Sequence, residues 1–148
     1  MNVPDARVVA ALAAVQAAMR DARDAWWVIG SAAVSLHGVR TQVADIDLLA
    51  SEHGAAAVMA RLGLVAERPA PHPSFRSQVF ARWPRSDRDV EIMAGLSVAV
   101  GTRWTRLAPS TRVAIGGVFV PGRAELMSIL AMFGRLKDLE RRRLLAAL

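Results

Sequence analysis

The sequence predicts an α/β (α+β) fold: a small mixed β-sheet with helices packed on one side, followed by a C-terminal helical segment. The chain has 148 residues, enough for one hydrophobic core. Segments with helical periodicity alternate with short runs of strand-forming residues, and Gly or Pro separates most of them. We therefore expect a single domain over residues 1–148, with a core at about 24–122 and C-terminal helices at about 123–148.

The first half of the chain predicts helices where apolar residues recur every three or four positions, and strands where apolar and polar residues alternate. Gly30 ends the first strand, and Gly38 and Gly63 end helices. Ser51 or Glu52 begins the last helix of this half. The predicted elements are a helix at 5–23, a strand at 26–29, a helix at 32–36, a strand at 45–49 and a helix at 51–63.

The second half begins with a loop marked by prolines at 69, 71 and 73. A turn at 84–87 separates two strands that we expect to pair antiparallel, and Gly116-Gly117 is typical of a two-residue hairpin turn. The predicted elements are strands at 75–83, 88–93, 112–115 and 118–120, and helices at 123–133 and 136–148.

Charge and composition narrow the classes of partner and location. The chain has 19 basic and 13 acidic residues, a formal charge of +6, which favours anionic partners such as nucleoside triphosphates or nucleic acid. Charge alone does not favour nucleic acid as the partner. All basic residues except Lys137 are Arg, and a coding bias can produce such a composition without any binding function. Cysteine is absent, and we recognise neither a secretory signal nor a membrane span. We expect a cytoplasmic protein.

Three acidic residues predict a site for a divalent cation. Asp45 and Asp47 are two positions apart on a predicted strand and therefore share one face of the sheet. Glu91 again lies between two apolar neighbours, so it is the candidate for a third ligand of one or two Mg²⁺ ions. The alternatives are a solvated strand face or a helix-capping turn for the two aspartates, and an exposed ion pair for Glu91.

Gly30 and Ser31 follow a predicted strand and open a predicted helix. At such a turn, backbone N–H groups and the Ser31 hydroxyl can face a phosphate, so these residues are candidates for nucleotide binding. His37, before Gly38, is expected to complete a hydrogen bond at a helix end rather than to bind a ligand. The basic run Arg141 to Arg143 is expected to be a solvated helix end.

These motifs together resemble the nucleotidyltransferase superfamily, which includes polymerase-β-like enzymes, small bacterial aminoglycoside nucleotidyltransferases and nucleotidyltransferase-like toxins. The resemblance rests on Ile29-Gly30-Ser31, the spacer at residues 32–44, Asp45-Ile46-Asp47-Leu48 and Val90-Glu91-Ile92. Leu36-His37-Gly38 and the segment from Arg135 to Leu139 also resemble small bacterial members.

The resemblance implies a nucleotidyltransferase fold and Mg²⁺-dependent transfer of a nucleoside monophosphate from a nucleoside triphosphate, such as ATP, to an acceptor. By this resemblance Asp45 and Asp47 bind both metals, and Glu91 binds the catalytic metal and activates the acceptor hydroxyl. The expected nucleotide-binding residues are Gly30, Ser31, Arg40, Thr41 and Lys137.

The sequence departs from the family pattern before the first acid. Small relatives often have Thr or Ser two residues before it and an Arg before that, where this chain has Val43 and Thr41, with Arg40 shifted by one position. Glu91 also stands where Asp is commoner. These differences leave a second hypothesis: a catalytically degenerate module that binds a nucleotide or a partner, as in a toxin–antitoxin pair. An RNA-binding module is a third.

The acceptor stays open at this stage. The resemblance allows a small molecule such as an antibiotic, a protein side chain or a tRNA end as in a toxin. Because little of the chain remains for an acceptor-binding domain, a homodimer or a partner protein is a further expectation.

Overall fold

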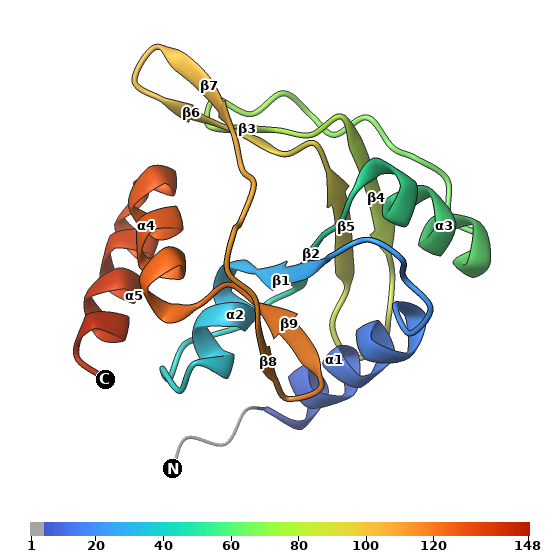
Figure 1. The fold of residues 1–148 in the computed structure, drawn as a ribbon, viewed down its shortest axis with the longest axis horizontal. Coiled ribbons are helices and arrows are strands. Elements are labelled where there is room, and N and C mark those ends of the chain that lie inside the picture. Colours follow the sequence, from blue (N-terminus) through green and yellow to red (C-terminus); the bar gives the residue numbers. More distant parts are fainter. Residues whose placement is uncertain (1–4) are drawn as a thin grey trace.

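The computed structural model describes residues 5–148 and shows a mixed α and β architecture (Figure 1). The helices are α1 (Ala6–Ala18), α2 (Gly30–Leu36), α3 (Glu52–Leu62), α4 (Arg123–Phe133) and α5 (Leu136–Ala146). The strands are β1 (Trp27–Ile29), β2 (Ile46–Leu49), β3 (Phe75–Arg76), β4 (Val79–Trp83), β5 (Val90–Ala94), β6 (Ser97–Val100), β7 (Arg103–Arg106), β8 (Val113–Ile115) and β9 (Val118–Val120).

The central sheet is mixed, as predicted. It has four strands in the order β1-β2-β5-β4. The inner strands β2 and β5 are parallel, whereas β1 and β4 pair antiparallel at the two edges. Smaller sheets join β3 with the β6–β7 hairpin and β8 with β9. The parallel pair at the centre is the feature that positions the candidate site.

The ends of α3 and α4 follow the sequence signals closely. The Ser51 side chain accepts a hydrogen bond from the backbone N–H of Gly54, which confirms the predicted start of α3. At its other end Gly63 adopts the left-handed conformation, with φ of 68°, that a helix-ending glycine allows. The α4 helix spans the predicted residues, Arg123–Phe133.

Two apolar clusters lie on opposite faces of the sheet. One contains Val28, Leu48 and Ile92 with residues of α1 and α3. The other contains alternate strand residues, Ile29 and Leu49 among them, together with Ile129 of α4. Figure 1 accordingly shows α1 and α3 on one side of the molecule and α4 and α5 on the other. The second face, where the apolar cluster is smaller, is the face that carries Asp47 and Glu91.

The β6–β7 hairpin was not predicted from the sequence. All four residues of β7 are exposed, so this strand has no apolar side to produce a recognisable alternation. The predicted strand at 75–83 is divided into β3 and β4, which belong to different sheets. The first helix ends at Ala18 rather than near residue 23.

Within residues 5–148, no helix combines the length and apolar character needed to cross a membrane.

Candidate functional site

The parallel pairing of β2 and β5 brings two of the predicted acids together. Asp47 is the register partner of Glu91, so the two side chains lie side by side on one face of the sheet. Asp45 precedes β2 by one residue and raises the pKa of both by its charge. The three acids, separated by up to 46 positions in the chain, therefore belong to one electrostatic cluster.

Gly30 approaches the same cluster from the neighbouring strand. Ile29 at the end of β1 pairs with Asp47, and the chain turns into α2 immediately afterwards with a φ of 67° at Gly30. A Cβ atom at position 30 would lie 2.5 Å from Asp47 Oδ2. Glycine is therefore required here both by the backbone conformation and by the close approach of a carboxylate.

The charges in this cluster are only partly compensated. Burial, followed by repulsion from Asp45 and Glu91, raises the pKa of Asp47 well above its usual value. Burial and the charge of Asp45 also raise the pKa of Glu91, although Arg82 opposes this from 3.3 Å. The two neighbouring carboxyl groups also act on each other directly, which raises the pKa of Asp47 and opposes the rise at Glu91.

The donor set suits a hard cation by its chemistry, because Asp45, Asp47 and Glu91 offer only carboxylate oxygens. In the part of the chain that the structure describes, however, no group of three or more His, Cys, Asp or Glu side chains has the spacing of a metal site. Asp47 and Glu91 are instead adjacent as register partners on β2 and β5. The side chains are thus gathered, but are not set in a complete ligand geometry.

A cavity of about 430 Å³, here called the polar cleft, opens beside these acids. Its volume lies within the range of small-ligand sites. Three of the five predicted nucleotide-binding residues, Gly30, Ser31 and Lys137, line it together with all three acids. Arg40 and Thr41 do not line it. Gln42 and Ala44, which lie between Thr41 and β2 in the chain, line it instead.

Two arginines near the C-terminus complete the polar cleft. Arg135 and Arg141 both line it, and both pair with Asp138, the one charged side chain among residues 5–148 that is buried, at 1% exposure. Arg135 makes two contacts with this carboxylate, at 2.6 and 3.0 Å. Arg141 also donates to Thr41 Oγ1 at 3.2 Å, so Thr41 reaches the cleft indirectly.

This arrangement was not predicted from the sequence. Arg141 is only 16% exposed, so it is not part of a solvated helix end as expected. The signal that could have revealed it is the spacing: Arg135, Asp138 and Arg141 are three positions apart, which places them on one side of α5 and its first turn. His37, in contrast, forms the expected helix-end hydrogen bond, between its Nε2 atom and the carbonyl oxygen of Pro121.

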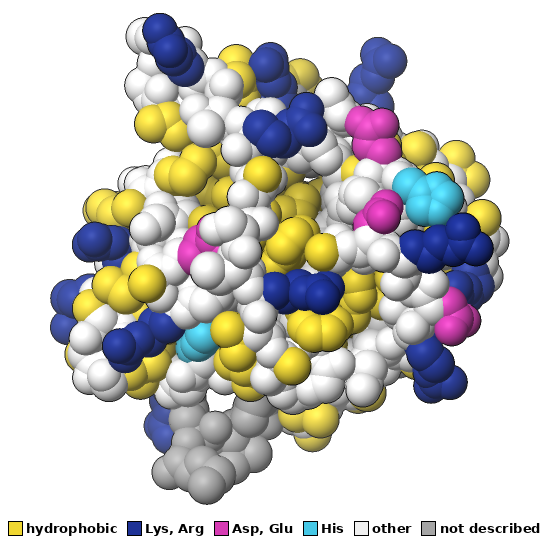
Figure 2. All heavy atoms as spheres, in the orientation of Figure 1, with side chains coloured by type: hydrophobic (Ala, Val, Ile, Leu, Met, Phe, Trp, Pro, Cys, Tyr) yellow, Lys and Arg dark blue, Asp and Glu magenta, His cyan; other side chains and the backbone are white. Residues whose placement is uncertain are grey.

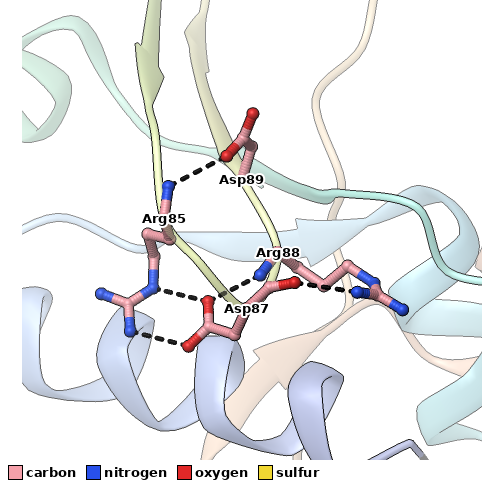
Figure 3. Close-up of polar contacts among 4 residues, drawn as sticks. All are labelled: Arg85, Asp87, Arg88 and Asp89. Atoms are coloured by element: carbon pink, nitrogen blue, oxygen red, sulfur yellow. Dashed lines mark hydrogen bonds and ion pairs between the residues drawn. The ribbon is translucent and has the colours of Figure 1, made fainter.

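Hydrogen bonds among four residues hold the turn between β4 and β5, just before Glu91 in the chain (Figure 3). Arg85 donates to both carboxylate oxygens of Asp87 at 2.9 Å, and its backbone N–H donates to Asp89. Arg88 Nε donates to the carbonyl oxygen of Val43 at 2.9 Å, which ties the turn to the segment before β2. This group of four residues, Arg85, Asp87, Arg88 and Asp89, is called the turn clamp below.

Comparison with solved structures identifies the fold. A Thermotoga maritima protein proposed to be a nucleotidyltransferase has a TM-score of 0.76 and 18% identity, over 96% of this chain and 94% of its own. The antibiotic-resistance factor ANT(2'')-Ia, solved in complex with adenylyl-2''-tobramycin, has a TM-score of 0.60 and 16% identity, over 94% of this chain and 87% of its own. The lincosamide antibiotic adenylyltransferase LnuA, solved with lincomycin, has a TM-score of 0.61 and 12% identity, over 99% of each chain.

No protein-family model matches this sequence, and no curated protein matches it. The structural likeness nevertheless confirms the predicted nucleotidyltransferase fold.

Proposed function

We propose that this chain, which has the nucleotidyltransferase fold, transfers a nucleoside monophosphate from a nucleoside triphosphate to an acceptor hydroxyl. The observation that carries the proposal is the register of β2 with β5, which sets Asp47 beside Glu91, while Gly30 approaches Asp47 from β1. A fold alone does not establish an activity, so the argument rests on this site.

The polar cleft suits a triphosphate because acidic and basic groups occupy different parts of its wall. Asp45, Asp47 and Glu91 come from the sheet, whereas Arg135, Lys137 and Arg141 come from α5 and the residue before it. Guanidinium groups bind phosphate oxygens with paired, charge-assisted hydrogen bonds. We assign Gly30 and Ser31 to triphosphate binding as well. Arg135 and Arg141 replace Arg40 and Thr41 as the expected nucleotide-binding residues.

Asp45, Asp47 and Glu91 would hold the one or two Mg²⁺ ions. When bound, Mg²⁺ supplies positive charge to the triphosphate and to the transferring phosphoryl group. The carboxylates of this chain orient the reacting groups, and the compensated charge relieves their mutual repulsion. Asp138 acts as a positioning residue, because it holds Arg135 and Arg141 against the cleft.

The chemical step is a displacement at the α-phosphorus. The acceptor oxygen forms a new bond to this phosphorus, and the bond to the oxygen that bridges the α- and β-phosphates breaks. Pyrophosphate leaves with the electron pair of that bond. The Glu91 carboxylate, which faces the cleft beside Asp47, accepts the proton of the acceptor hydroxyl.

Calorimetric titration tests the binding half of this proposal. Each of the four nucleoside triphosphates is titrated with and without Mg²⁺ into the wild type and into the Asp45→Asn, Asp47→Asn double variant. Binding that depends on Mg²⁺ and is lost in the variant supports the assignment and identifies the base. Equal binding in both proteins would place the nucleotide elsewhere.

A second candidate is the degenerate module that binds a nucleotide or a partner without turnover. The observation that favours it is the departure from the family pattern before the first acid, since Arg40 and Thr41 do not line the polar cleft. Pyrophosphate release separates the two functions, since the degenerate module would bind the nucleotide and release none in the presence of any acceptor.

A further inference from the structure

A second cavity reaches two of the three acids, Asp47 and Glu91. This cavity, of about 320 Å³, is called the aromatic hollow. It shares Asp47, Glu91, Phe133 and Arg135 with the polar cleft, and its remaining lining residues belong only to the hollow. A molecule in the hollow would therefore lie next to the carboxylates at which the nucleotide is proposed to react.

The wall of the aromatic hollow is largely apolar. Phe75 and Phe133 meet edge to face, with ring centroids 5.1 Å apart, and His72 lies 5.1 Å from Phe75. Phe80, Met93 and Leu96 extend this surface over the sheet. Such a wall favours a flat apolar group over a heavily hydrated one, because burying an unpartnered polar group costs free energy.

The charged residues of the hollow favour a negative group. Asp47 and Glu91 are its acids, and both are committed to the metal site in the proposed function. Its three arginines differ in their partners: Arg82 pairs with Glu91 at 3.3 Å, and Arg135 with Asp138 at 2.6 Å. Arg76 has no ion pair with any residue from 5 to 148, and stacks on the Trp104 ring at 4.2 Å.

Stacking leaves the hydrogen-bonding edge of Arg76 available. A guanidinium group that lies over a ring uses its flat face, whereas its N–H groups point outward in its plane. Trp104 is 39% exposed, so this pair lies at the surface, where Arg76 lines the hollow. Figure 2 shows further basic side chains around this part of the molecule, where β3, β6 and β7 lie.

We propose that the aromatic hollow binds the acceptor, and that this acceptor is a hydroxyl-bearing apolar acid rather than a polycationic aminosugar. The inference rests on the proposed function for the role of the hydroxyl. The apolar part of the acceptor lies against Phe75, Phe80 and Phe133, and its carboxylate, sulfonate or phosphate pairs with Arg76. A polycation such as tobramycin, which appears adenylylated in the ANT(2'')-Ia complex, meets arginines instead.

Two fluorescent probes with the same rings test this inference without nucleotide. Anilinonaphthalene sulfonate carries a negative charge, and N-phenylnaphthylamine is its uncharged analogue. Both are titrated into the wild type, into Arg76→Gln, and into Arg103→Gln as a matched control, because Arg103 is an arginine of the same region that does not line the hollow. Circular dichroism verifies that each variant is folded.

We expect the wild type and Arg103→Gln to bind the sulfonate at least tenfold more tightly than the neutral probe. Arg76→Gln should weaken the sulfonate about tenfold and leave the neutral probe unchanged, since one charge-assisted contact is lost. Tobramycin should not displace the sulfonate. Equal affinity for the two probes, an unaffected Arg76→Gln variant, or displacement by tobramycin would each overturn the inference.

The same protein preparations separate this inference from the proposed function. Mg²⁺-dependent nucleotide titration reports on the polar cleft, which Arg76 does not line. Normal nucleotide binding with a failed probe titration overturns the acceptor assignment alone. Selective probe binding in a chain that binds no nucleotide overturns nucleotidyl transfer and leaves the hollow as a site for anionic apolar ligands.

Discussion

The acid cluster (Asp45, Asp47 and Glu91) and the turn clamp both contain aspartates, and Glu91 follows Asp89 of the clamp by only two positions, but the electrostatics of the two regions are opposite. In the turn clamp, Asp87 accepts hydrogen bonds from the Arg85 side chain and from the Arg88 backbone, and these lower its pKa to about 2. In the acid cluster, burial and neighbouring carboxylates raise the pKa of Asp47. One carboxylate is held in its charged form, and the other is driven towards its neutral form.

This difference separates a structural use of charge from a functional one. A paired carboxylate stabilises the turn that it closes, whereas crowded carboxylates destabilise the fold until a cation or a proton compensates them. Groups with perturbed pKa values in a cleft are candidates for function. The variants below test whether the two regions respond in opposite ways.

The largest expected effect is the loss of transfer in Asp47→Asn. Loss of a metal-binding carboxylate should lower the rate by about a thousandfold, which corresponds to about 4 kcal/mol of transition-state stabilisation. Pyrophosphate release measures this rate once an acceptor is found. In EDTA, where no cation compensates the acids, the same variant should be more stable than the wild type by about 1 kcal/mol. A neutral amide then replaces the Asp47 carboxylate, which neighbouring carboxylates repel. An unchanged rate would contradict the metal assignment.

Gly30→Ala is expected to destabilise the fold by about 3 kcal/mol. The left-handed backbone accounts for about 1 kcal/mol, and the rest comes from the contact of the new Cβ with Asp47 Oδ2. Gly63→Ala is the matched control, because Gly63 has nearly the same φ, 68°, and no atom within 4 Å of an added Cβ. Urea denaturation of both variants measures the difference. Equal losses would show that the approach to Asp47 is not tight.

Asp87→Asn should destabilise the fold by about 2 kcal/mol, in contrast to Asp47→Asn. The substitution weakens the paired contacts with Arg85 and the hydrogen bond from the backbone N–H of Arg88. Urea denaturation at neutral pH is the measurement. A stabilised Asp87→Asn variant would remove the distinction between the two regions.

The smallest expected effect is a difference in pH dependence. The folded pKa of Asp87, about 2, lies below its ordinary value of 3.8, so its stabilisation is present above about pH 4 and is lost as the pH falls towards 2. Asp87→Asn should therefore approach the wild type in stability at low pH. The raised pKa of Asp47 predicts the opposite sign, with the advantage of Asp47→Asn growing as the pH rises above about 4.

Denaturation midpoints in EDTA between pH 2 and about 7 would show both trends. Parallel profiles for the two variants would contradict the assigned pKa directions.

The sequence was informative wherever a local signal decided the structure. Gly30, Gly63 and the alternating acids at 45 and 47 predicted a turn, a helix end and a shared face because each depends on neighbours in the chain. The β6–β7 hairpin has no such signal, since β7 is exposed on both faces. The pairing of Asp138 with Arg135 and Arg141 depends on how α5 lies against the cleft, which local patterns do not specify.

The segment between α4 and α5 gives the two cavities a common boundary. Phe133 and Arg135 line both of them, and the residue between, Gly134, ends α4 in the left-handed conformation. A shift of this short junction would enlarge one cavity and reduce the other. Occupancy of the two sites would then be thermodynamically linked. A bound nucleotide would change the affinity for the acceptor, and a bound acceptor would change the affinity for the nucleotide by the same factor.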